Sequence, residues 1–230
     1  FGTHNWVYLI YFLSILPIIP AVMFMLSPMP DMDVSSVSEG NKGTKRRALG
    51  MALCVGCIFF GSCAENAMSN WVSSFMENAL KIDKTVGDIL GMAGFAILLG
   101  ITRITYAKYG KNIMKVLLVG MVGATVCYIS IGLTSNVVIA FIACILTGLF
   151  TAMLWPGALI FMEDNIPAVG VMAYALMAAG GDMGAAVGPQ IVGVVTDLVT
   201  ASEGMINFAT TLNLTVEQLG MKVGLLLGSL

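Results

Sequence analysis

Charged residues are scarce in this chain of 230 residues. Asp, Glu, Lys and Arg together make up 10% of the sequence, whereas a typical soluble domain carries about 25%. Hydrophobic residues make up 58%. So few charges cannot cover the outside of a water-soluble protein of this size, and the composition therefore predicts a protein that lies in a lipid bilayer.

The residue types that carry most catalysis and metal binding are also few. His4 is the only histidine, and neither an HExxH nor a GxSxG motif occurs. Cys54 and Cys57 form a CxxC pair without a second pair or a nearby histidine, and all five cysteines lie in apolar runs. The sequence predicts no enzymatic activity, no metal site and no cofactor.

The net charge of −2 offers no basic surface, because the lysines and arginines fall in separate clusters. This distribution excludes nucleic acid as a partner and leaves the lipid bilayer as the expected surroundings. About 20 apolar residues in helical form cross a bilayer. Six stretches meet this requirement: 6–27, 49–75, 86–107, 113–134, 137–161 and 169–199.

A seventh helix is expected to begin near Val216, where Thr215 and Gln218 have the spacing of a capping box. The sequence stops at Leu230, too early for that helix to span a membrane. The predicted fold is therefore an all-α, polytopic membrane bundle whose last helix is truncated.

Basic residues in short loops predict which side of the membrane faces the cytoplasm. The segment 28–48 contains Lys42, Lys45, Arg46 and Arg47, and the loop 108–112 contains Lys108 and Lys111. Two crossings separate these segments, so both are expected on the cytoplasmic side. The segment 28–48 is polar, contains two prolines and is predicted to be a linker.

Two acidic residues lie deep within predicted spans. Glu65 and Asp182 both fall near the middle third of the bilayer, counted at about 1.5 Å per helical residue. Ionisable side chains at such depth usually face a cavity and mark a path for an ion or a substrate. The alternative is a structural acid that is neutralised by a partner or stays protonated. We favour the functional interpretation.

Polar residues form a stripe around Glu65. Ser62, Asn66, Ser69 and Ser73 lie on one helical face, and Glu65 and Asn70 border it. A stripe of this length is costly against lipid, so it is expected to line a hydrated cavity. Hydrogen bonding between helices is the alternative, but Glu65 and the two asparagines are larger than that role requires.

The surroundings of Asp182 contain several residues that weaken a helix. Gly180 and Gly181 precede it, and Gly188 and Pro189 follow. We expect a discontinuous helix here, in which Asp182 faces water or a partner. Glycines repeated at intervals of four also allow close helix packing, which is the expected role of most of them.

Two further features are candidates for an ion pair or a gate. Arg103 lies about four residues inside its span and is expected to extend toward the membrane surface, with a pair to Asp182 as the alternative. The sequence Trp155–Pro156 predicts either a simple bend or a stacking surface or gate for a solute.

Three stretches carry a resemblance to a known family. The first is GSCAENAMSNWVSSF (61–75), the second GITRITYAKYGKN (100–112), and the third comprises GLFTAMLWPGALIF and MAAGGDMGAAVGPQIVGVVTD. They resemble the seventh helix, the loop between helices eight and nine, and the tenth and eleventh helices of the major facilitator superfamily. The nearest branch is that of the fucose permeases and similar sugar–proton symporters. In the loop, Lys108, Gly110 and Lys111 match, whereas Ala107 replaces the usual aspartate.

The resemblance implies a C-terminal half of a transporter. Residues 1–27 would be the sixth helix, 28–48 the central cytoplasmic loop, and 49–230 helices seven to twelve. The partners would be a small-molecule solute, a proton, and a missing N-terminal half of the same transporter. The implied location is the plasma membrane.

The resemblance also implies a function, which is secondary active transport of a small polar solute by alternating access. Proton-coupled sugar-type symport is the leading hypothesis, with Glu65 in a substrate or proton role. The stretch GAAVGPQIVG resembles a motif of proton-driven exporters, so a drug or metabolite exporter is the alternative. A membrane scaffold or enzyme that transports nothing is a remote third.

Overall fold

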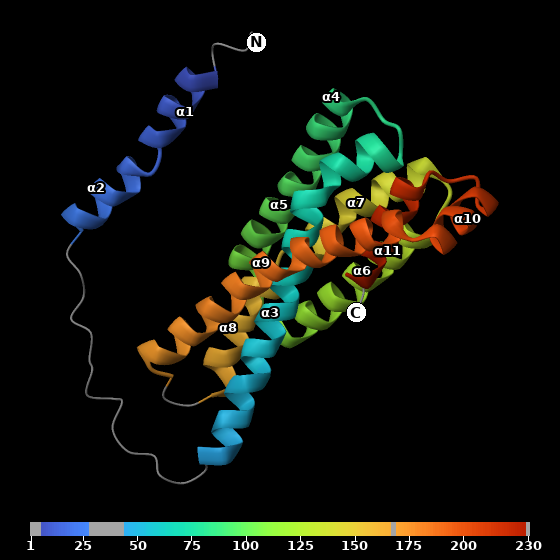
Figure 1. The fold of residues 1–230 in the computed structure, drawn as a ribbon. Helices are drawn as coiled ribbons and strands as arrows, with labels where there is room; N and C mark the ends of the chain where they lie inside the picture. The colour runs from blue at the N-terminus through green and yellow to red at the C-terminus, as the bar shows by residue number, and fades with distance from the viewer. Residues whose placement is uncertain (1–5, 28–43, 167–168, 229–230) are drawn as a thin grey trace. The chain divides into compact units, whose positions relative to one another are not determined.

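The computed structural model describes residues 6–27, 44–166 and 169–228, and in these ranges it contains helices and no strand (Figure 1). The fold class is therefore all-α, as the composition predicted. Contacts divide the chain into two units, Phe1–Ser38 and Glu39–Leu230.

The first unit contains two short helices, α1 (Trp6–Ile15) and α2 (Ile18–Leu26). Pro17 separates them because it lacks an N–H group that could bond to the carbonyl of Leu13. The N–H of Leu16 bonds to that carbonyl instead, at 3.2 Å. The helix predicted over 6–27 is thus interrupted, and its crossing of a bilayer stays a prediction.

The second unit begins with α3 (Thr44–Ser74), which continues into the π-helix η2 (Phe75–Ala79). Of the predicted linker, residues 44–48 therefore belong to a helix, and residues 28–43 lie outside the described ranges. The next span consists of α4 (Lys84–Val86), η3 (Gly87–Met92) and α5 (Ala93–Tyr109).

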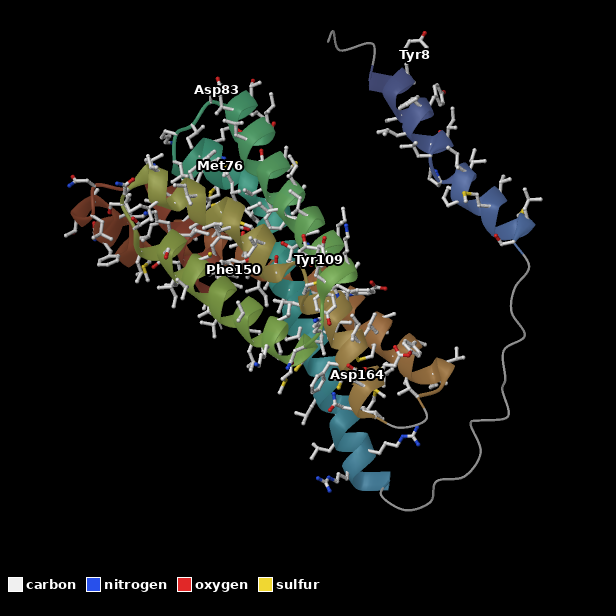
Figure 2. The ribbon with its side chains drawn as sticks, turned by 180° about the vertical axis from the view of Figure 1, so that it is seen from behind. Tyr8, Met76, Asp83, Tyr109, Phe150 and Asp164 are labelled. Atoms are coloured by element: carbon white, nitrogen blue, oxygen red, sulfur yellow. The ribbon has the colours of Figure 1, made fainter. Side chains whose placement is uncertain are left out.

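The remaining helices follow with short turns. They are α6 (Ile113–Leu133), α7 (Val137–Thr151), α8 (Leu154–Asn165), α9 (Val171–Ala201), α10 (Glu203–Thr211) and α11 (Val216–Leu227). Within the described residues, 5 helical segments between Arg46 and Ala201 are long and apolar enough to cross a membrane. They confirm the spans predicted between 49 and 199. Asp83 and Asp164 mark the two ends of this bundle (Figure 2).

Glycines allow α3 and α9 to pack closely. A Cβ atom on Gly180 would lie 2.8 Å from Cγ1 of Val55, and one on Gly188 would lie 2.5 Å from the carbonyl oxygen of Cys63. Both distances are shorter than van der Waals contact. The spacing of four residues places these glycines on one face of α9, and the prediction of tight packing is confirmed.

The predicted break around Asp182 is wrong. Helix α9 is continuous from Val171 to Ala201, with Pro189 inside it. Close contact with α3 holds the glycine-rich segment in helical form, because a long packed interface outweighs the weak helix propensity of a few glycines.

Helix α11 is attached to the ends of two spans at the Asp83 end. Thr215 and Gln218 form the predicted capping box. The side chain of Gln218 also donates to the carbonyl of Ala79 at 2.9 Å, and the buried Lys222 donates to the carbonyl of Thr134 at 2.6 Å. These bonds satisfy carbonyl groups that helix ends leave without partners.

We predict that Gly184→Ala destabilises the bundle while Gly56→Ala does not. A Cβ atom on Gly184 would collide with the carbonyl oxygen of Phe59, whereas one on Gly56, in α3, meets nothing within 4 Å. Overpacking of this kind costs about 1–3 kcal/mol. The measurement is the thermal stability of the two purified variants in one detergent, and equal stability of the two would contradict the packing role.

Candidate functional site

An ion pair joins α3 to α5 inside the bundle. Nη2 of Arg103 lies 2.9 Å from both carboxylate oxygens of Glu65. The side chain of Glu65 is 18% exposed and that of Arg103 is 39% exposed, so solvent screens the pair only in part. The sequence had suggested the membrane surface or Asp182 as the surroundings of Arg103, and the structure instead pairs it with Glu65.

The same guanidinium group reaches a third span. Nε of Arg103 donates to the carbonyl oxygen of Ala152 at 2.9 Å. That carbonyl lies between α7 and α8, and in an uninterrupted helix it would accept from residue 156. Pro156 has no N–H group, so the carbonyl is left without its usual donor, and Arg103 supplies one.

Pro156 has two effects: it interrupts the helix, and it leaves the Ala152 carbonyl free to accept from Arg103. The sequence did not show that the two are linked. It lies in the first turn of α8, just after the interruption at Ala152 and Met153. The predicted bend at Trp155–Pro156 is present as this interruption. The freed carbonyl fixes the direction of the Arg103 side chain, and the fixed guanidinium in turn orients the carboxylate of Glu65.

The polar stripe of α3 is bonded mostly within its own helix. The amide nitrogen of Asn66 donates to the carbonyl of Ser62 at 3.0 Å, and that of Asn70 donates to the carbonyl of Asn66 at 2.9 Å. The hydroxyl of Ser69 also bonds to the carbonyl of Asn66, at 3.3 Å. Among the described residues, no donor reaches the side-chain oxygens of Asn66 and Asn70. Two acceptors therefore stay open to a solute or to water.

The far end of this stripe was not predicted from the sequence. The hydroxyl of Ser73 makes a short hydrogen bond to Oδ1 of Asp88 in η3, so the stripe ends at an acid from the neighbouring span. The signal in the sequence was Asp88 itself, an acid early in the predicted span 86–107. The π-helical geometry of η2 and η3 on either side could not be derived from residue patterns.

Asp182 and Trp155 do not join the ion pair. Asp182 is exposed on α9, and it has no ion pair or hydrogen bond with any residue in the described ranges. Trp155 packs into a cluster of apolar residues that includes Ile58 and Met177, and its ring lies against Gly181. In this structure it acts as a packing residue between α8 and α9.

The basic loop motif connects α5 to α6. Lys108 lies in the last turn of α5, Gly110 caps that helix, and Lys111 is exposed. Asn112 caps α6 by accepting from the N–H of Lys115 at 3.3 Å. The motif follows Arg103 on the same helix and its connecting loop, five to eight residues farther along the chain.

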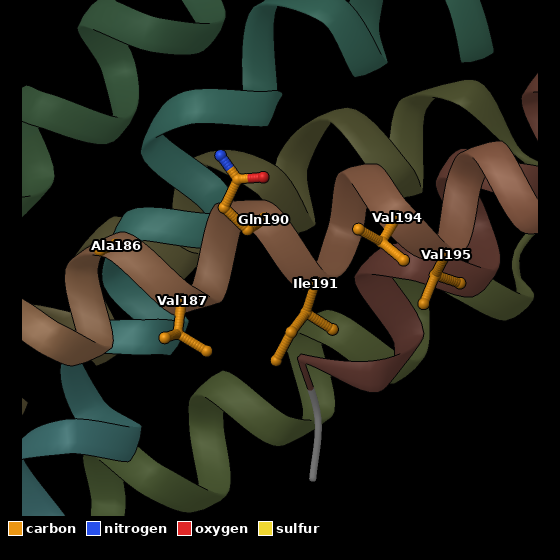
Figure 3. A pocket seen from close by; sticks show the side chains of 6 residues that line it. All are labelled: Ala186, Val187, Gln190, Ile191, Val194 and Val195. Carbon is orange, nitrogen blue, oxygen red and sulfur yellow. The ribbon is translucent and has the colours of Figure 1, made fainter.

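A pocket on α9 lies apart from these polar groups (Figure 3). It holds about 410 Å³. Its lining comes from one helix and consists of Ala186, Val187, Gln190, Ile191, Val194 and Val195. Val187 and Ile191 extend from one side of α9 while Gln190 extends from the other. The pocket surface is almost entirely apolar, and none of its lining residues is ionisable.

Ligands for a metal ion do not come together in the described part of the chain, where no group of three or more His, Cys, Asp and Glu side chains is close enough to hold one. The polar groups that do converge are one acid, one arginine and a carbonyl. They are suited to binding a proton, water or an uncharged polar solute.

A family model described as Major Facilitator Superfamily matches residues 1–189. The chain belongs to the major facilitator superfamily. It is therefore a multi-pass membrane protein of a family of secondary transporters. No curated protein and no solved structure shows a significant match to the chain.

We predict that Arg103→Lys costs about 1 kcal/mol of stability, the usual net value of one hydrogen bond. Lysine keeps the charge opposite Glu65 but lacks the second donor for Ala152. In a Pro156→Ala background the restored N–H group satisfies that carbonyl, so the cost of Arg103→Lys should shrink. Stability is followed by thermal unfolding in detergent.

Pro189→Ala is the matched control for this cycle. It also removes a proline from within a helix, but Arg103 does not contact its surroundings, so the two changes should add. An equal cost of Arg103→Lys in all three backgrounds would show that Pro156 and Arg103 are not coupled.

Proposed function

We propose that this transporter moves a small, uncharged polar solute together with protons, by alternating access. The observation that carries the proposal is the Arg103 guanidinium, which binds the Glu65 carboxylate and the Ala152 carbonyl at once. Three spans thereby meet at one group, and one of its partners can take up a proton.

Protonation of Glu65 would change the contacts of all three spans. A neutral carboxyl no longer attracts the guanidinium as an ion, so the link between α3 and α5 would weaken. Arg103 would keep its bond to the α7–α8 junction. Proton binding would therefore favour one arrangement of the helices over another, which is the requirement for coupling a proton to a conformational change.

The polar stripe supports an uncharged solute. Glu65 and Arg103 neutralise each other, so the net charge that they present is zero. The open side-chain oxygens of Asn66 and Asn70 accept hydrogen bonds from hydroxyl groups, as a sugar would supply them. The resemblance to fucose permeases also favours a sugar. Asp182 is proposed as a second acid of the path on the basis of its depth and exposure.

A complete path requires a second set of helices. We propose that residues 49–230 are the C-terminal half of the transporter, that residues 1–27 are its sixth helix, and that an N-terminal half supplies the opposite wall. The plasma membrane is the proposed location, with the segments 28–48 and 108–112 in the cytoplasm. The exposure of Asn70 and Asp182 is consistent with a wall that faces another half.

Export of an apolar compound is the second candidate. The observation that favours it is the apolar pocket on α9, whose residues Ala186, Val187, Gln190 and Ile191 belong to the exporter-like stretch GAAVGPQIVG. Competition assays separate the two functions. Inhibition of transport by sugars supports the first candidate, and inhibition by lipophilic cations supports the second.

We predict that Glu65→Gln abolishes uptake driven by a proton gradient. Glutamine cannot release a proton, and loss of a charged partner for Arg103 costs about 1.5–3 kcal/mol, which corresponds to about tenfold or more in an equilibrium constant. Uptake is measured in vesicles that contain the complete gene product. Exchange of labelled for unlabelled solute, which needs no net proton movement, should persist.

Glu77→Gln is the matched control. Glu77 lies at the Asp83 end, where its carboxylate is 3.6 Å from Nζ of Lys84 and 40% exposed. Its replacement should leave uptake unchanged. Normal, pH-dependent uptake by Glu65→Gln would refute the proposed role of Glu65.

A further inference from the structure

Helix α10 has two unlike faces. At 3.6 residues per turn, its apolar residues fall within an arc of about 160°. They are Met205, Ile206, Phe208 and Ala209, with Leu212 directly after the helix. The polar residues Glu203, Asn207, Thr210 and Thr211 occupy the opposite side. From the sequence, helices were predicted only up to residue 199 and again from near Val216.

The apolar face lies on the end of the α9 span and on the first turn of α11. Ala209 is fully buried and belongs to a cluster with Val199 of α9 and Leu219 of α11. Alanine is small, so α10 approaches these helices closely, and the larger apolar side chains beside it extend past the protein. Phe208 remains 53% exposed and Ile206 41%.

We propose that α10 lies in the membrane–water interface and inserts these exposed apolar side chains among the acyl chains of the surrounding bilayer. The occupant of the surface is thus the lipid itself. Helix α9 is a membrane-spanning segment that ends at Ala201, and α10 begins two residues later. This short connection holds α10 at the depth where the bilayer ends.

Exposed apolar surface continues from the span onto α10. Val194 and Leu198, in the last turns of α9, are 53% and 65% exposed, and Met205 and Leu212 follow at 40% and 47%. Such side chains on a membrane span face lipid. A helix with one apolar and one polar face lies flat at this boundary, with its apolar side buried by about 5–10 Å.

The charges of α10 define the kind of lipid contact. Residues 202–212 contain Glu203 and no lysine or arginine. Anionic headgroups therefore have nothing to attract, and burial of apolar side chains is left as the driving force. Insertion should be equally deep in neutral and in anionic membranes.

The backbone fixes this orientation relative to α11. The N–H of Leu214 bonds to the carbonyl of Ala209 at 3.0 Å, and Asn213 adopts a positive φ of 54°. This tight turn joins α10 to the cap of α11 at Thr215. Rotation of α10 about its axis would break the turn. Ile206 and Phe208, at the two edges of the apolar face, therefore stay directed at the lipid.

The test places a fluorescent label on each face. Single cysteines are introduced as Ile206→Cys and Phe208→Cys on the apolar flanks, and as Asn207→Cys and Thr211→Cys on the polar face. The background carries Cys57→Ala and Cys63→Ala, since Cys54, Cys127 and Cys144 are buried. The labelled proteins are reconstituted into phosphatidylcholine vesicles with brominated acyl chains, which quench the label on contact.

We expect labels at 206 and 208 to be quenched roughly threefold more than labels at 207 and 211, because of the depth difference between the two faces. Adding phosphatidylglycerol should not change the ratio. Equal quenching at all four positions, or stronger quenching at 207 and 211, would overturn the proposal. Weak quenching at every position would also overturn it, because the flanks would then face water or another protein.

Size-exclusion chromatography of each variant checks that the label has not unfolded the protein. As a second measurement, Phe208→Asn should reduce quenching of the label at 206, because it removes the most exposed apolar side chain of α10. Unchanged quenching in that variant would show that the apolar side chains do not hold the helix in the bilayer.

Discussion

The contacts of one guanidinium group connect three spans of this protein. Arg103 carries several donors on one planar group. Its Nη2 donates to the carboxylate of Glu65 on α3, and its Nε donates to the carbonyl of Ala152 between α7 and α8. A charge at this depth requires partners. The carboxylate supplies the opposite charge. Pro156 has no N–H group to bond to the Ala152 carbonyl, so that carbonyl is free to accept from Arg103. The interruption of one helix and the ion pair between two others are thus parts of one arrangement.

Helix α3 is the element on which the other spans are arranged. Glycines of α9 press against one of its faces and leave no room for side chains there. A second face carries Asn66, Ser69 and Asn70, whose bonds run along the helix. The close packing on one side leaves the polar side free. Helix α3 thus has a closely packed face and a polar face that we propose contacts the solute.

Much of this fold was evident in the sequence. The length and apolar character of the runs predicted the five spans, and the capping box at Thr215 and Gln218 predicted the start of α11. The prediction of a break near Asp182 was wrong, because helix propensity depends only on residues close together in the chain and takes no account of packing. The packing partner of those glycines lies more than a hundred residues away in the sequence, on α3.

The amino-acid sequence by itself determined the membrane environment and the five spans between residues 49 and 199, because both depend on composition and spacing along one helix. Only the tertiary structure decided the acidic partner of Arg103, the donor that bonds to the Ala152 carbonyl, and the contact of Ser73 with Asp88. These contacts join residues 15 to 49 positions apart. Helix rotation and register set such contacts, and a periodic pattern in one segment contains no information about the angle at which another segment faces it.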